Sequence, residues 1–110
     1  MYLIVSLDGV PPRVVLRDEG DFTAFKVVVD GVGDWADLSD AVAGRARVEP
    51  PHLWVDAGEV RALGRPEDPE WCRQLDQMVD FARSKGWLDQ DGAIRAHCEW
   101  ASGSPADGGP

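Results

Sequence analysis

The chain has 110 residues and a formal net charge of −9, from 11 Lys and Arg against 20 Asp and Glu. This length fits one domain, and the acidity excludes attraction to nucleic acid or anionic membranes through a bulk positive field. Hydrophobic residues make up 44% of the chain and include five Trp, which is enough to build a core. The sequence therefore predicts one small globular domain.

Residue usage and cysteine spacing indicate the source and compartment. Lys26 and Lys85 are the only lysines and no Asn occurs, a bias typical of GC-rich coding and thus of a bacterial protein. No signal-peptide pattern is present, and no stretch reaches the roughly 18 apolar residues of a membrane span. Cys72 and Cys98 form neither a disulfide framework nor a zinc pattern. We therefore expect a cytoplasmic protein with reduced thiols, no membrane association and no cofactor.

The N-terminal thirty residues predict a hairpin followed by an ambiguous segment. Residues 2–7 form a short apolar run, and residues 13–17 read as a second strand. Asp-Gly and Pro-Pro lie between them, so the two strands are expected to form a hairpin. Residues 22–30 combine apolar residues at helical spacing with a β-branched run, which predicts a helical turn that gives way to extended chain.

Two short helices and two strands are expected in the middle of the chain. Asp34 and Asp56 are both suited to begin a helix, because a carboxylate at the N-cap accepts hydrogen bonds from the first free backbone amides. The predicted elements are a helix ending at Val42, strands at 45–49 and 52–55, and a helix ending at Gly64.

Residues 69–85 predict a long amphipathic helix. Asp68 suits its N-cap, Pro69 its first position and Gly86 its end. One apolar stripe follows the helix at spacings of mostly three and four residues: Trp71, Leu75, Met78, Val79 and Ala82.

The C-terminal part predicts a strand and a tail. Residues 93–100 alternate between apolar and polar side chains, as a half-buried strand does. Residues 101–110 hold no large apolar residue and predict a disordered tail. The whole chain therefore predicts an α+β fold: one domain over residues 1–100, with a mainly antiparallel sheet packed against the long helix 69–85, plus short helices.

Two of the predicted strands share a polar pattern. Their polar faces carry Arg45, Arg47 and Glu49 in one case and Arg95, His97 and Glu99 in the other. Direct antiparallel pairing would set opposite charges against each other at both ends, with Arg47 opposite His97. The simple interpretation is a set of exposed cross-strand pairs. The alternative is a ligand-binding cationic patch, since guanidinium groups bind carboxylates and phosphates in bidentate fashion; its residues would be Arg47, His97, Arg95 and Arg45.

Catalytic and metal-binding patterns are weak. Strand alternation directs Cys98 away from its neighbours His97 and Glu99, so Cys98 is predicted to be a core residue. His52 and His97 lie on different segments with no ligand cluster around them, which argues against a metal site. Carboxylate pairs are explained by helix caps, turns and a solvated helix face. The sequence therefore predicts no catalytic residue and no metal ligand.

The tryptophans divide into two groups. Trp71 and Trp100 fall on apolar faces and are expected in the core. Trp35, Trp54 and Trp87 do not, and exposed Trp is enriched at binding hot spots. These three are therefore candidates for partner binding, or else they cover the edges of the core.

We therefore expect a non-catalytic protein-interaction or regulatory module whose partner is another protein. Two alternatives stay open. One is a small anionic-ligand-binding protein or enzyme that uses the Arg/His patch. The other is an acidic nucleic-acid mimic, because residues 66–91 carry seven acidic and three basic side chains; it requires carboxylates along one continuous face.

Overall fold

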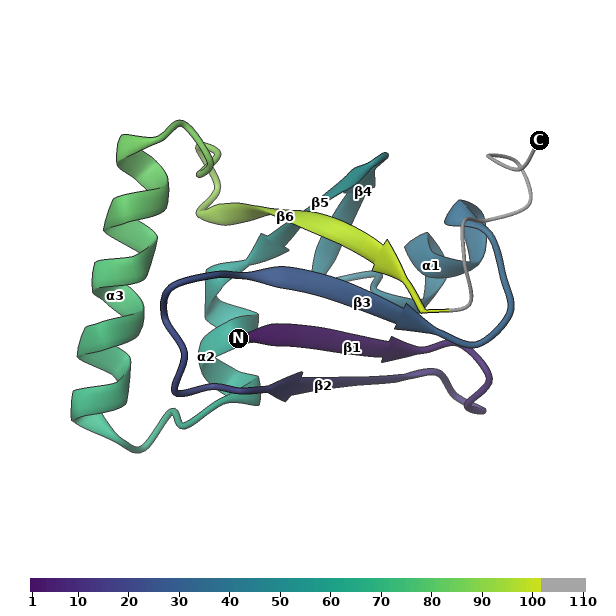
Figure 1. Cartoon of the computed structure of the whole chain (residues 1–110), viewed down its shortest axis with the longest axis horizontal. Coiled ribbons are helices and arrows are strands. Elements are labelled where there is room, and N and C mark those ends of the chain that lie inside the picture. Colours follow the sequence, from purple (N-terminus) through teal and green to yellow (C-terminus); the bar gives the residue numbers. More distant parts are fainter. Residues whose placement is uncertain (102–110) are drawn as a thin grey trace.

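The computed structural model describes residues 1–101 and contains six strands and three helices (Figure 1). The elements in chain order are β1 (Tyr2–Ser6), β2 (Arg13–Arg17), β3 (Lys26–Asp30), α1 (Trp35–Ala41), β4 (Ala46–Glu49), β5 (His52–Asp56), α2 (Ala57–Leu63), α3 (Pro69–Ser84) and β6 (Ala93–Trp100). They form a single α+β domain, as predicted. Apart from Ala101, the tail predicted at 101–110 lies outside the described residues.

All six strands join in one mixed sheet with the order β2-β1-β3-β6-β5-β4. Three neighbouring pairs are antiparallel, and β3 runs parallel to both β1 and β6. The helical turn expected at the start of 22–30 does not form, and residues 26–30 become the central strand β3. Its β-branched run explains this outcome, because Val packs well on a pleated surface.

The predicted direct pairing of 45–49 with 94–99 is wrong. β4 and β5 form a hairpin across Pro50-Pro51, and β5 uses its other edge to pair with β6. β5 therefore lies between the two strands, so Arg47 is opposite Trp54 instead of His97.

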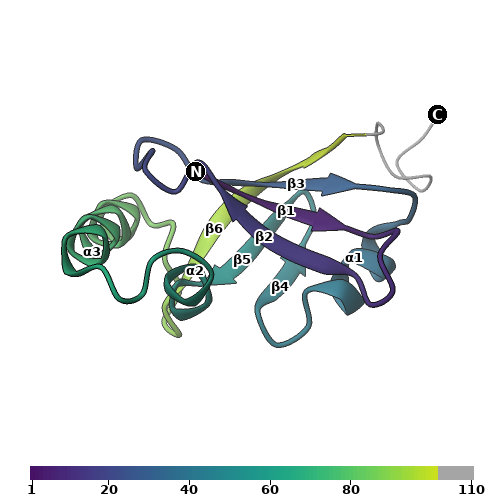
Figure 2. The ribbon, with the colours of Figure 1, turned by 90° about the horizontal axis from the view of Figure 1, so that it is seen from below.

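The sheet curves, and α1 and α2 lie on its inner face (Figure 2). Inward side chains of the strands pack with Leu38 of α1 and Val60 of α2, both fully buried. The predicted N-caps are confirmed: Asp34 accepts from the amide of Asp37 in a capping box, and Asp56 accepts from Gly58. On the opposite face, here called the outer face, the exposed or half-buried side chains include Tyr2, Ile4, Lys26, Val28, His52, Trp54, Arg95 and His97.

The long helix α3 lies across the end of the sheet where β1, β3 and β6 begin (Figure 1). Its predicted stripe is buried at Trp71, Leu75 and Ala82. The Trp71 ring packs beside Phe22 with centroids 6.0 Å apart and ring planes tilted by 52°, and its Nε1 donates to the carbonyl of Glu19 at 2.7 Å. α3 is therefore fixed to residues 18–25, here called the β2–β3 connection. No helix among residues 1–101 is long and apolar enough to cross a membrane.

Gly64, which ends α2, leaves the space that the Trp71 ring fills. A Cβ at position 64 would overlap the indole and lie 3.1 Å from Leu16 Cδ2. We expect Gly64→Ala to lower the free energy of unfolding by about 1–3 kcal/mol, the usual cost of overpacking. Gly20→Ala is the matched control, because a Cβ there meets no atom within 4 Å. Urea unfolding measures both; equal stability of the two variants would contradict this packing.

Candidate functional site

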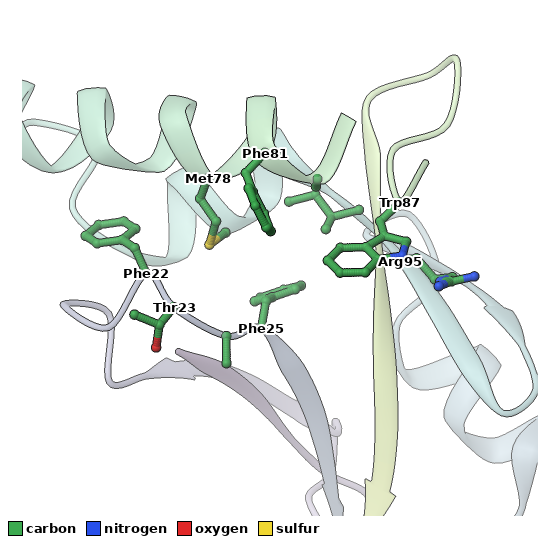
Figure 3. A pocket seen from close by; sticks show the side chains of 10 residues that line it. Phe22, Thr23, Phe25, Met78, Phe81, Trp87 and Arg95 are labelled. Atoms are coloured by element: carbon green, nitrogen blue, oxygen red, sulfur yellow. The ribbon is translucent and has the colours of Figure 1, made fainter. Parts of the chain in front are cut away.

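A groove runs along α3, between this helix and the β2–β3 connection (Figure 3). Its apolar part, here called the aromatic groove, is formed by Phe22, Phe25, Met78, Phe81 and Trp87. Arg95 lies at one end. Towards the other end the groove continues past Thr23, Gln74 and Gln77. The site thus has an apolar centre with polar groups at both ends.

Two aromatic side chains at this groove are exposed to solvent. Phe81 is 56% exposed and Trp87 is 37% exposed. Their rings meet edge to face with centroids 6.1 Å apart. Val10 and Val32 are the other large apolar side chains that are exposed within residues 1–101, and neither lines this groove. An adjacent pair of exposed aromatic rings is typical of a surface that another molecule covers.

The end of α3 places Trp87 beside Phe81. Gly86 has φ +78°, a conformation that suits glycine. The amide of Trp87 donates to the carbonyl of Ala82 at 2.8 Å, and the amide of Gly86 donates to Arg83 at 3.1 Å. This pattern is a Schellman motif, in which the residue after the left-handed glycine folds back over the last helical turn.

The β2–β3 connection supplies the opposite wall through Phe22 and Phe25. The ammonium group of Met1 holds this segment by donating to the carbonyls of Asp21 at 2.7 Å and Ala24 at 2.9 Å. Asp21 also accepts from the hydroxyl and the amide of Thr23, and these bonds lower the pKa of Asp21. The wall is therefore an ordered turn.

Two cationic groups, Arg95 and Lys85, lie beside the aromatic part of the groove. Arg95 is exposed and has no carboxylate partner among the described residues. Lys85 Nζ lies 5.5 Å from the centroid of the Phe81 ring. By contrast, carboxylates on the exposed side of α3 are paired with arginines, in the pairs Glu70–Arg73, Asp76–Arg61 and Asp80–Arg83. The local charge at the groove therefore differs from the acidity of the whole chain.

The structure brings the predicted cationic patch together only in part. Arg45 and Arg47 line one hollow beside Trp54. Trp54 in turn lies between Arg47 and Arg95 in one lateral row of the sheet. Arg47 lies 3.4 Å from Asp89 and 5.5 Å from the centroid of the Trp54 ring, while Arg45 lies 3.8 Å from Glu59. His97 is in a different lateral row of the sheet from Arg47 and faces His52 instead. Arg95 alone of the four predicted ligand-binding residues borders the aromatic groove.

The three candidate tryptophans also separate. Trp35 is partly buried and packs edge to face on Trp100, with centroids 5.2 Å apart. Trp54 lies on the outer face beside Arg47, and its indole Nε1 is buried without a hydrogen-bond partner among the described residues. Only Trp87 of the three lines the aromatic groove.

Both cysteines are free. Cys98 is 6% exposed, which confirms the predicted core position, and burial raises the pKa of its thiol to about 11. This thiol is therefore protonated at neutral pH, and a protonated, buried thiol is a poor nucleophile. The Cys72 Sγ lies 3.6 Å from the carbonyl oxygens of Arg65 and Pro66.

Most of the aromatic groove was not predicted from sequence. Phe81 has a detectable signal, because it falls outside the apolar stripe of α3 and so remains an aromatic residue on a solvated side. Phe22, Phe25 and Met78 look like ordinary core residues, and only the docking of α3 on the β2–β3 connection brings them together. Comparisons with family models, with curated proteins and with solved structures found no match for this chain.

We expect Gly86→Ala to lower the free energy of unfolding by about 1 kcal/mol, because a Cβ is disfavoured at this positive φ. No neighbouring atom lies within 4 Å of the added Cβ, so the loss reports backbone conformation alone. Gly86→Asn is the control and should lose less, since Asn tolerates the left-handed region better. Thermal and urea unfolding measure the difference; equal losses in Ala and Asn variants would contradict this explanation.

Asp89 orders the turn before β6, and its effect should depend on pH. Its carboxylate accepts from the amides of Ala93 at 2.8 Å and Asp91 at 2.9 Å, and Arg47 lies nearby. These interactions, that of Ala93 foremost, hold the pKa of Asp89 below its ordinary value. A lowered folded-state pKa stabilises the fold above the unfolded-state pKa, and this contribution disappears as the pH falls through the folded-state value.

We therefore expect Asp89→Ala to be less stable than the natural chain at pH 7, and the gap to narrow at acidic pH where the carboxyl group is protonated. Asp91→Ala is the control, because the Asp91 side chain makes no hydrogen bond among the described residues. Urea unfolding across this pH range gives the result. A gap that stays constant or widens in acid would be inconsistent with a charge-dependent role for Asp89.

Proposed function

We propose that this protein is a non-catalytic interaction module that binds a partner polypeptide in the aromatic groove. One observation carries the proposal: Phe81 and Trp87 are neighbouring exposed aromatic rings above an apolar groove. Burying such rings against a partner removes apolar surface from water, and tryptophan dominates many protein interfaces for this reason.

The groove fits an extended segment with one large apolar side chain and a neighbouring carboxylate. The apolar side chain would enter between Phe22, Met78 and Phe81. The carboxylate would meet Arg95, whose guanidinium can form two parallel hydrogen bonds to it. Gln74 and Gln77 at the other end offer amide groups to the backbone of the segment.

The negative charge of the chain is compatible with such a partner. Charges separated by more than about 8–10 Å are largely screened at physiological ionic strength. A carboxylate in contact with Arg95 therefore interacts mainly with the local cations. The other charges of the chain affect the rate of association more than this contact.

The test is a selection of random peptides displayed on phage against the full chain. We expect enriched peptides to share a Trp, Phe or Leu next to Asp or Glu. For a synthesised peptide, Phe81→Ala and Trp87→Ala should each weaken binding by more than about tenfold, as hot-spot residues do. Arg95→Gln should weaken the binding of peptides that carry the acidic residue more than the binding of their amide analogues.

Val32→Ala is the matched control, because Val32 is an exposed apolar residue away from this groove. Binding by this variant should equal that of the natural chain. Unfolding curves for every variant establish that the fold is retained. Selection of no common motif, or equal binding by the natural chain and the two aromatic variants, would rule out the groove as the interaction site.

A further inference from the structure

Two histidines that are 45 positions apart in sequence lie directly opposite each other on the outer face. His52 of β5 pairs in register with His97 of β6, and their ring centroids are 6.2 Å apart. The next pair along the two strands is Pro51 and Cys98, and the amide of Cys98 donates to the carbonyl of Pro51. Pro51–Cys98 is therefore a hydrogen-bonded pair, and such pairs alternate with non-hydrogen-bonded pairs along an antiparallel ladder. The histidines therefore occupy the closer, non-hydrogen-bonded type of position, where opposite side chains approach best.

The charged groups around this pair favour a cation on the side of His52. Glu49 lies opposite His52 on β4, in the same lateral row. Lys26 lies opposite His97 on β3, and its ammonium group is held by Glu99 at 3.1 Å and over the Tyr2 ring at 5.9 Å. The charge of Lys26 is therefore partly balanced by Glu99, while Glu49 is left on the side of His52.

We propose that His52 and His97 together bind one divalent transition-metal ion of the class that includes Zn²⁺, Ni²⁺ and Cu²⁺. Imidazole is a preferred ligand of these ions. Metal–nitrogen bonds of about 2.0–2.1 Å need the two ligating nitrogens roughly 3–3.5 Å apart. At a close cross-strand position, rotation about the side-chain bonds of the two histidines would bring the rings to this spacing.

In the proposed site, water would complete the coordination. No group of three or more His, Cys, Asp or Glu side chains within residues 1–101 is arranged to hold a metal. The two imidazoles are therefore the protein ligands, and Glu49 contributes negative charge beside them. A bound ion would join β5 to β6 and so stabilise the folded state, because it binds this pair only when the strands are paired.

The test is a Zn²⁺ titration of the untagged full chain, followed by calorimetry and by the NMR signals of the imidazole rings. We expect one equivalent to bind and the signals of both rings to change together. His52→Ala and His97→Ala should each weaken binding by more than about tenfold, the smallest loss expected for a group that supports a metal site. The melting temperature should rise with Zn²⁺ in the natural chain and not in the double variant.

Two controls separate this site from general metal binding. Arg17→Gln changes the charge of the same face on β2, three strands away from His97. Cys72→Ser removes the more exposed thiol. Both variants should leave Zn²⁺ binding unchanged. The ring signals of the natural chain provide a readout that does not depend on any variant folding. The proposal is overturned if neither ring or only one ring responds, or if the double histidine variant binds as the natural chain does.

Discussion

The docking of Trp71 is the interaction on which the arrangement of this protein depends. Its indole fills the space above Gly64 at the end of α2, packs beside Phe22, and donates to the carbonyl of Glu19 at 2.7 Å. One side chain thereby joins α3 to α2 and to the β2–β3 connection. Burial of such a ring stabilises by several kcal/mol in general (about 3–5 kcal/mol is lost on truncation to Ala). The position of α3, and with it the aromatic groove, follows from this contact.

Part of the acidity of the chain has a local explanation in the structure. Asp21, Asp34, Asp56, Asp68 and Asp89 each accept hydrogen bonds from backbone amides at turns or helix starts. Such positions favour aspartate because its short carboxylate satisfies amides that have no partner in the helix or turn. On α3, further carboxylates pair with arginines. Nucleic-acid mimicry, which requires carboxylates along one continuous face, stays a prediction.

Local signals in the sequence predicted the helices well. The strand pairing was harder to predict, because it depends on residues that are far apart in the sequence. Asp34, Asp56 and Asp68 identified the helix starts, because a cap depends on residues three positions apart. The predicted pairing of β4 with β6 was wrong, because matching charge patterns do not reveal that β5 is inserted between these two strands. The same insertion explains why the His52–His97 pair was not predicted. Of the candidate site, Trp87 was predicted as one of three partner-binding tryptophans and Arg95 as one member of a ligand-binding cationic patch. The groove that joins these two residues depends on Trp71.

The exposed aromatic groove depends on the buried contacts of Trp71. Trp71 fixes α3, the Schellman motif at Gly86 turns Trp87 back onto Phe81, and the connection that carries Glu19 also carries Phe22. The aromatic groove is thus formed by the same packing that completes the core, so it is an ordered surface in the free protein. A preformed site loses less conformational entropy on binding than one that must order itself.

The most direct test of this account is to map amide chemical-shift changes in the ¹⁵N-labelled chain as a selected peptide is added. The changes should concentrate at Phe22–Phe25, Met78–Phe81 and Trp87, with little change at the buried Leu38 of α1. Changes concentrated instead on the outer face, around Ile4, Val28 and Trp54, would contradict it.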